Sequence, residues 1–318
     1  MGKITILDTS VATKNMGDEI IVDSVKREIN SIFNKNTMFF HVPTHEVISR
    51  HSRRIINESD YSFVAGTNLL TSKFHFIKAN QWNINYIDAV NIERVVLLGV
   101  GWSDYQNSPG LLTKLIYKNA LDSEIIHSVR DNYTKDKLSE IGINNVVNTA
   151  CATMWPLTPQ HCKKIPKKKS RNVVMTITDY RRDEVRDKEL VNILLKNYER
   201  VFIWIQGSND EEYINSLSDS VEIISPTLEA FDNLLNSEMD LDYVGTRLHA
   251  GIRAMQKKRR SIIIGVDNRA IEKEKDFNIK VINRNNIELL NRTINEEFET
   301  LINLDFEKIN IWRKQFLK

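Results

Sequence analysis

The sequence predicts an α/β protein that contains two doubly wound parallel sheets. Short apolar runs rich in β-branched residues alternate with segments whose apolar residues recur at helical spacing. The expected strands are continuously apolar, which is typical of parallel strands covered by helices on both faces. The alternation stops once, in a segment rich in proline and lysine, and then starts again. We therefore expect two domains of similar architecture that face a cleft.

The first half of the chain contributes four expected strands and three expected helices. The run KITILDT predicts the first strand, and the segment after it carries four apolar residues on one helical face: Ile20, Ile21, Val25 and Ile29. The other expected strands cover 62–66, 94–101 and 124–129, and the other helices cover 109–121 and 131–142. The last of these helices ends at Gly142, a residue type that commonly follows a final helical turn.

The segment WPLTPQHCKKIPKKKSR, at 155–171, predicts a break between domains. It holds three of the six prolines and a run of basic residues. We expect an N-terminal domain over 1–160, a linker over 161–171, a C-terminal domain over 172–300 and a final helix within 301–318 that packs back toward the N-terminal domain. The basic run is interpreted as solvated linker, and approach to an anionic membrane surface is the other interpretation.

The second half repeats the alternation without repeating a motif, so we expect no internal sequence duplication. The expected strands cover 172–178, 200–206, 221–224, 241–245 and 261–266. The expected helices cover 188–198, 209–217, 227–236 and 304–317.

Composition narrows the class of function. The net charge is only +2, so the overall balance does not indicate a nucleic-acid partner. The two cysteines, Cys151 and Cys162, are too few for a disulfide framework and are not spaced as metal ligands. The opening residues lack the apolar run of a signal peptide. We expect a reduced, cytoplasmic setting, with the inner face of the membrane as a second location, and neither a metal nor a cofactor.

Ligands of open α/β sheets bind beyond the carboxyl ends of the strands, so polar residues that follow strands are the candidates. The first is the turn NMGDEII at 15–21. Gly17 permits a tight turn and Asp18 is placed to cap the next helix, which accounts for both without a ligand. The functional interpretation adds helix amides suited to a hydroxyl-bearing or anionic group. The turn matches neither a Walker loop nor a GxGxxG fingerprint, so a nucleoside triphosphate or a dinucleotide is not indicated.

Two arginines also follow expected strands. Arg130, in SVRDNY, would either pair with Asp131 or clamp an anion, since a guanidinium can bind carboxylate or phosphate through two parallel hydrogen bonds. Arg269, in GVDNRA, would by itself count as a surface arginine.

The stretch LDYVGTRLHAGIRAM, at 241–255, places a strand directly before a helix. Thr246 stands where an N-cap is expected. Arg247 and His249 then fall at the positive end of the helix dipole, where cations are disfavoured. A negative group at this point would remove the conflict. Otherwise, His249 would be a core histidine and Arg247 would point to solvent.

Two further patterns are assigned no function. The DLD at 240–242 mimics the DxD of metal-dependent glycosyltransferases but runs directly into a strand. The segment DYRRDE, at 179–184, is interpreted as a solvated loop.

Together, NMGDEI, SVRD and GTRLHAGIRAM followed by DNRA resemble the motifs of the polysaccharide pyruvyl transferases, in the same order along nearly the whole chain. The resemblance implies two Rossmann-like domains in a GT-B-like arrangement, with the acceptor on the N-terminal side and the donor on the C-terminal side. It implies transfer of the three-carbon unit of phosphoenolpyruvate to two hydroxyls of one sugar in a bacterial surface polysaccharide or its precursor. The products are a cyclic ketal and phosphate.

The resemblance also implies site residues. Arg130, Arg247, His249 and Arg269 would bind phosphoenolpyruvate, and His249 would be the general acid because histidine titrates near neutral pH. The partners implied are phosphoenolpyruvate and a glycan or lipid-linked saccharide, with peripheral membrane association as an addition. Asn15, Gly17, Asp18 and Asn68 are assigned to the acceptor side.

This chain departs at two places from the pattern of the family that it resembles. AGTNLL, at 65–70, keeps only Gly66 of a glycine-rich stretch, and CATMW, at 151–155, replaces an Asp-Pro pattern.

Two other functions are alternatives to pyruvyl transfer. One is a GT-B-type glycosyltransferase that uses a nucleotide sugar. The other is a non-catalytic anion- or glycan-binding subunit, which would tolerate the loss of His249.

Overall fold

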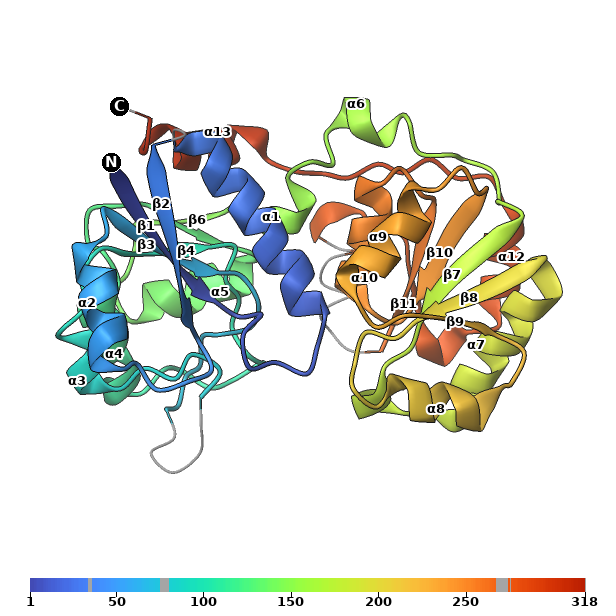
Figure 1. Cartoon of the computed structure of the whole chain (residues 1–318), viewed down its shortest axis with the longest axis horizontal. Coiled ribbons are helices and arrows are strands. Elements are labelled where there is room, and N and C mark those ends of the chain that lie inside the picture. Colours follow the sequence, from blue (N-terminus) through green and yellow to red (C-terminus); the bar gives the residue numbers. More distant parts are fainter. Residues whose placement is uncertain (34–35, 75–79, 267–273, 275, 318) are drawn as a thin grey trace. The chain divides into compact units, whose positions relative to one another are not determined.

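The computed structural model describes the chain except residues 34–35, 75–79, 267–273, 275 and 318 (Figure 1). The chain forms two compact units. The first unit comprises 1–13, 21–155 and 305–318, and the second comprises 14–20 and 156–304. Each unit has a sheet and a core of its own and is described by itself.

The first unit is built on a parallel sheet with the strand order β2-β1-β3-β4. Its strands are β1 (Gly2–Asp8), β2 (Thr37–Pro43), β3 (Tyr61–Ala65) and β4 (Val95–Leu98). Past the end of β4, a bridge between Val100 and Val129 adds the parallel pair β5 (His127–Val129) and β6 (Val146–Asn148). Because β2 and β3 lie on opposite sides of β1, the winding direction changes between β1 and β3.

Helices cover both faces of the first sheet, because alternate residues of its strands are apolar on each face. The face that carries Ile4 and Ile6 packs against α1 and the C-terminal helix α13. The face that carries Leu7 and Val64 packs against the helices that follow β2, β3, β4 and β5 (Figure 1). The helices are α1 (Gly17–Ile32), α2 (Arg50–Glu58), α3 (Tyr86–Ala89), α4 (Leu111–Ala120), α5 (Asn132–Glu140), η1 (Ala152–Met154) and α13 (Phe306–Lys314).

The second unit has a six-stranded parallel sheet with the order β12-β11-β10-β7-β8-β9. Its strands are β7 (Asn172–Thr176), β8 (Arg200–Trp204), β9 (Glu222–Ile224), β10 (Leu241–Gly245), β11 (Ser261–Gly265) and β12 (Val281–Asn283). The chain winds outward from β7 to β9, then returns to the other side of β7 to form β10. The winding direction therefore changes between β7 and β10.

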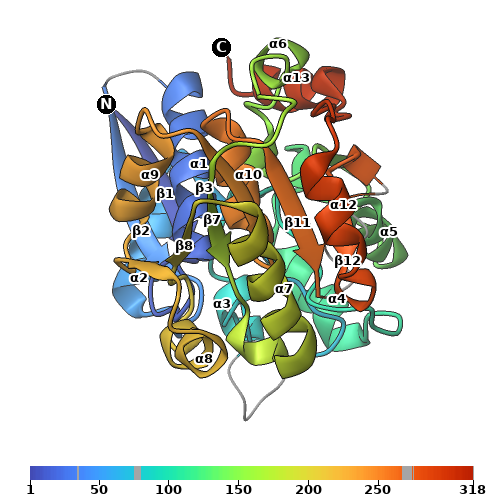
Figure 2. The ribbon, with the colours of Figure 1, turned by 90° about the vertical axis from the view of Figure 1, so that its right-hand side faces the viewer.

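Two layers of helices cover the second sheet. One face packs against α7, α8 and α12, and Figure 2 shows α7 and α12 side by side in front of the strands. On the other face, the Trp204 ring stacks on Phe231 of α9 with centroids 4.2 Å apart, and Gly251 lets α10 approach Tyr243 and Ile263 closely. The helices are α6 (Pro159–Cys162), η2 (Asp179–Arg181), α7 (Glu184–Asn197), α8 (Asp210–Leu217), α9 (Leu228–Asn236), α10 (Leu248–Gln256), η3 (Arg284–Asn286) and α12 (Leu289–Asn295).

The predicted fold class is confirmed: the chain is an α/β protein with two doubly wound, Rossmann-like parallel sheets. The boundaries between the two compact units lie at other residues than the domain boundaries expected from the sequence. Residues 14–20 group with the second unit, as does the expected linker, in which Leu157, Cys162 and Ile165 are buried. The final segment, 305–318, groups with the first unit. In the described part of the chain, no helix combines the length and the apolar character needed to cross a membrane.

Candidate functional site

In the second unit, the point where the winding direction changes is occupied by the residues that follow β7 and β10. Thr246 Oγ1 lies 2.7 Å from Thr178 Oγ1, and the Thr246 amide donates to the Thr176 carbonyl at 3.0 Å. These contacts hold the two strand ends together. They also use the Thr246 hydroxyl, so Thr246 is not the N-cap expected from the sequence. Helix α10 begins one residue later, and its N-cap is Arg247.

Arg247 is buried and ion-paired within the unit. Its Nη2 donates to Asp210 Oδ1 at 2.6 Å and to Asp179 Oδ1 at 3.0 Å, and its Nε donates to the Ile177 carbonyl at 2.8 Å. The Tyr180 ring lies 5.0 Å from the guanidinium. The negative group that the sequence requires beside Arg247 is therefore supplied by two aspartates of the same unit.

The pKa values of the two aspartates are shifted in opposite directions. Burial is the largest influence on both and raises the pKa. At Asp210 it prevails over the Arg247 charge, so the pKa lies above its usual value. At Asp179 the Arg247 charge and hydrogen bonds outweigh burial, so the pKa lies below its usual value. Sequence reasoning missed both aspartates as partners of Arg247. Asp179 falls in a segment interpreted as a solvated loop, and no motif marks Asp210.

His249 stands in the first turn of α10 and is half-buried. The side chain of the N-cap residue, Arg247, makes no hydrogen bond that caps this helix end. Strand β10 is therefore followed by the first-turn amides of α10, a nine-residue helix, and by the His249 imidazole. Such a helix terminus favours a bound anion.

The turn at 15–18 belongs to the second unit and is attached to the end of β8. Gln206 Nε2 donates to Asn15 Oδ1 at 2.8 Å, and the same oxygen accepts from the Gly17 amide at 3.1 Å. A Cβ on Gly17 would lie 2.7 Å from Gln206 Nε2, so a larger residue at 17 would displace the Gln206 amide. Helix α1 begins at Gly17, so Asp18 lies inside its first turn and is not the cap that the sequence suggested.

Arg130 lies in the first unit, directly after β5, and is 7% exposed. Its Nε donates to Asp131 Oδ2 at 3.1 Å, so the pairing given as one of the two interpretations of Arg130 is present. The side chain passes over Gly101, where a Cβ would come within 2.2 Å of Nε. Arg130 is therefore held at the carboxyl end of β5 by a contact that only glycine allows.

Of the other sequence candidates, Asn68 follows β3, and its Oδ1 is buried without a hydrogen-bond partner among the described residues. Arg269 lies outside the described residues. Asp242 of the DLD pattern is buried at the opposite end of β10, where Arg260 Nη1 donates to it at 2.8 Å. This contact agrees with its dismissal as a metal ligand.

Three of the six basic residues in the segment 163–171 form ion pairs within the unit. Lys167 pairs with Glu299 at 2.9 Å, Lys168 with Glu297 at 3.2 Å, and Arg171 with Glu199 at 2.7 Å. The segment is therefore a poorer anion-binding surface than its sequence suggests.

The family model of the polysaccharide pyruvyl transferases matches residues 15–268. The chain belongs to this family. It is thus a transferase of the family that pyruvylates polysaccharides, as the motifs around Arg130 and His249 indicated. No curated protein matches the chain.

Solved structures resemble this chain only distantly. A UDP-N-acetylglucosamine 2-epimerase has a TM-score of 0.45 and 10% sequence identity, with 99% of this chain and 90% of the other covered. The UDP-GlcNAc 2-epimerase from Neisseria meningitidis bound to UDP-GlcNAc has a TM-score of 0.40 and 13% identity, with 93% and 95% covered. LpCGTa in complex with UDP has a TM-score of 0.40 and 9% identity, with 99% and 93% covered.

Proposed function

We propose that the chain transfers the three-carbon unit of phosphoenolpyruvate to two hydroxyls of one sugar, forming a cyclic pyruvate ketal. The methylene carbon gains a proton and becomes the ketal methyl group. Two C–O bonds to the sugar form at the neighbouring carbon, and the C–O bond to phosphate breaks. The two hydroxyl protons balance the proton on the methyl group and the proton that leaves on phosphate. The acceptor we propose is a sugar of a surface polysaccharide or its lipid-linked precursor.

The observation that carries this proposal is the position of His249. It stands at the start of α10, where the second sheet changes its winding direction, in the company of helix amides. Phosphoenolpyruvate combines a phosphate and a carboxylate, both of which helix N-termini and arginines bind well. We assign His249 as the general acid that protonates the methylene carbon, since imidazole exchanges protons near neutral pH.

The remaining assignments follow the chemistry of each residue. We propose that Arg130 and Arg269 bind the anionic groups of the donor. For Arg247 we propose a supporting role, because binding the donor directly would compete with its ion pairs to Asp179 and Asp210. Asn15, Gly17, Asp18 and Asn68 are proposed for the acceptor. We do not extend the proposal to membrane binding by 163–171, because acids of the same unit pair with three of its six basic side chains.

The test is to incubate the protein with phosphoenolpyruvate and a panel of synthetic and lipid-linked glycosides, and to follow phosphate release and the mass of the glycoside. We expect a ketal adduct with the wild-type protein. Replacing His249 by Ala should lower the rate by about 10²- to 10⁴-fold, the range of general acid catalysis. The matched control is His51→Ala, on the exposed surface of α2, which should act as wild type.

Three results would contradict the proposal. The first is full activity of the His249 and Arg269 alanine variants. The second is thermal stabilisation by nucleotide sugars and not by phosphoenolpyruvate, which would favour a glycosyltransferase. The third is glycan binding without any transfer, which would favour a non-catalytic subunit.

A further inference from the structure

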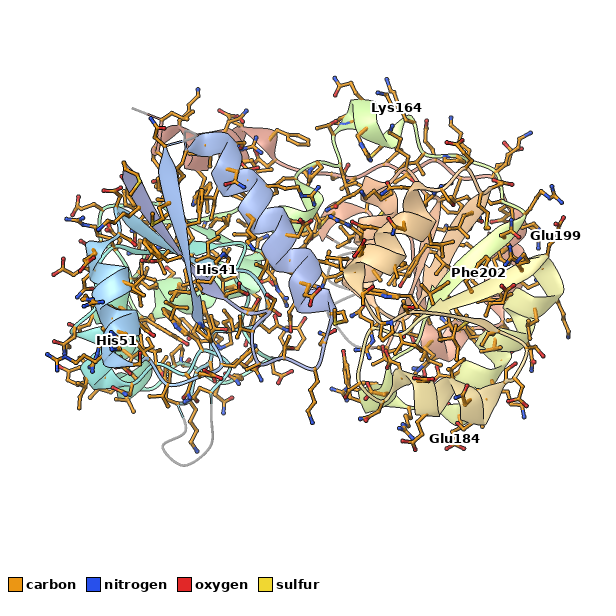
Figure 3. All side chains as sticks on the ribbon, in the orientation of Figure 1. His41, His51, Lys164, Glu184, Glu199 and Phe202 are labelled. Atoms are coloured by element: carbon orange, nitrogen blue, oxygen red, sulfur yellow. The ribbon has the colours of Figure 1, made fainter. Side chains whose placement is uncertain are left out.

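The first unit holds a carboxylate–imidazole pair that the residues assigned above do not include. Asp8 is the last residue of β1, and His41 lies on the neighbouring strand β2, with Asp8 Oδ2 2.6 Å from His41 Nδ1. Ile6 pairs with His41 and Asp8 pairs with Pro43, so both side chains are on the strand face that carries Ile4 and Ile6. Figure 3 labels His41 on β2 and His51 on α2.

The environment of Asp8 keeps its carboxylate ionised. Burial raises its pKa, but hydrogen bonds from His41 and from the Ser10 hydroxyl and amide outweigh burial, so the pKa is below its usual value. The Ser10 amide and hydroxyl both donate to Oδ1, at 2.8 and 2.6 Å, and Oδ2 is left to the imidazole. An ionised Oδ2 fixes the proton of neutral His41 on Nδ1, because that nitrogen must donate.

The other ring nitrogen of His41 is then a proton acceptor. The His41 side chain is 32% exposed. Within the described residues, Nδ1 has a hydrogen-bond partner and Nε2 has none. A buried carboxylate that orients a partly exposed imidazole through Nδ1, leaving Nε2 to accept a proton, is the arrangement of a general base. His127 shows the contrast: it is fully buried, and both of its ring nitrogens are hydrogen-bonded to backbone groups.

The pair also lies where an open sheet binds its ligand. The first sheet changes its winding direction between β1 and β3, and Asp8 ends β1 at the carboxyl edge of the sheet. Across this point, β3 continues into Gly66 and Thr67, both with positive φ, and then into Asn68. The buried Asn68 Oδ1 has no partner in the described part of the chain and is suited to accept from a ligand hydroxyl.

We propose that His41, oriented by Asp8, is the general base that accepts the proton of the attacking sugar hydroxyl. This inference rests on the proposed pyruvyl transfer. As the first sugar oxygen bonds to the central carbon of the donor, its O–H bond breaks and the proton passes to His41 Nε2. The methylene carbon is protonated by His249. The second hydroxyl then displaces phosphate, its proton leaves on phosphate, and the two histidines return to their initial states by exchange with water.

Activity measurements test the role of His41. His41→Gln should lower kcat by about 10²- to 10⁴-fold while changing the KM for phosphoenolpyruvate by less than about threefold, because the variant leaves donor binding intact. Asp8→Asn should lower kcat by about tenfold or more, since an amide can also stabilise the wrong imidazole tautomer. His51→Gln is the matched control. It removes an exposed histidine of α2 and should stay within about threefold of wild type.

A second measurement is independent of catalysis. Nitrogen-15 NMR of the imidazoles in the protein alone should show neutral His41 protonated on Nδ1, and Asp8→Asn should shift the proton toward Nε2. This readout also separates a local tautomer change from unfolding of the variant.

Two outcomes would overturn the inference while leaving pyruvyl transfer intact: wild-type kcat in His41→Gln, or a neutral His41 protonated on Nε2. Failure of the proposed function is a different result. In that case the wild-type protein forms no adduct from phosphoenolpyruvate with any glycoside.

Discussion

Arg247 Nη2 donates to Asp210 Oδ1 across 2.6 Å, joining the N-cap residue of α10 to the first residue of α8. The Asp210 side chain is fully buried, and its Oδ2 accepts from the Gly207 amide at 2.7 Å. A Cβ on Gly207 would approach Arg247 Nη2 to 2.4 Å, so glycine is needed here. Three strand ends of the second sheet are thus fixed by one guanidinium, which in turn fixes the start of α10 and His249.

The first prediction concerns the stability that this ion pair provides. Arg247→Met should lower the free energy of unfolding by about 3–5 kcal/mol, because it leaves the buried Asp210 and the partly buried Asp179 carboxylates without their cation. The control is Arg200→Met, which removes an exposed pair with Glu222 and should cost less than about 1 kcal/mol. Urea denaturation measures both. An equal loss in the two variants would contradict the structural role of Arg247.

A second prediction uses Gly101 to displace Arg130 without changing its charge. In Gly101→Ala the new Cβ would lie 2.2 Å from Arg130 Nε, so the arginine must move. We expect the KM for phosphoenolpyruvate to rise and kcat/KM to fall by about tenfold or more, since bidentate recognition depends on geometry. Arg130→Lys should behave similarly. The control is Gly110→Ala, whose nearest contact would be 3.9 Å away. Unchanged kinetics in Gly101→Ala would remove Arg130 from the site.

The third prediction concerns the C-terminal helix α13. Trp312 is fully buried, and its ring centroid lies 5.9 Å from that of Phe63 and 5.6 Å from that of Trp155. Trp312→Ala should cost about 3–5 kcal/mol of unfolding free energy through the cavity that it leaves. Ile311→Ala, at the neighbouring 44% exposed residue, should change stability by no more than about 0.5 kcal/mol. If denaturation showed Trp312→Ala as stable as Ile311→Ala, α13 would contribute nothing to the core of the first unit.

The sequence predicts the fold well where burial imposes a clear period. Continuous apolar runs indicated β1, β3, β4 and β7, because these strands are covered on both faces. It does not predict α2, in which Ile56 is the buried residue and most of the others are polar or charged. It also does not predict β2, an edge strand with mixed burial. His41 lies on β2, so its pairing with Asp8 could not be anticipated.

The candidate site shows a similar limit. The sequence identifies Arg247 and His249 because they contradict the preference of a helix N-terminus. It does not reveal that Asp179 and Asp210 neutralise Arg247, because these residues follow β7 and β8 and only the sheet order brings them to β10. An unusual residue can thus be found by local rules, whereas its partner depends on topology.

The last prediction is a pH dependence of stability that arises from His127. This histidine is fully buried: the Leu97 amide donates to Nδ1 at 3.2 Å, and Nε2 lies 2.9 Å from the Asp122 carbonyl. Burial lowers its pKa to about 4 from an ordinary value of 6.5. Between these values the unfolded chain binds more protons than the folded protein, so stability falls as the pH falls.

The expected loss from His127 is about 3 kcal/mol between pH 7 and pH 4, since one pKa unit corresponds to about 1.4 kcal/mol. Urea denaturation at several pH values measures it. Because carboxylates also titrate in this range, the decisive quantity is the difference between wild type and His127→Gln. The variant should be less stable than wild type at pH 7, and the gap should narrow steadily as the pH approaches 4. A gap that stays constant over this range would show that His127 carries the same charge in the folded and unfolded states.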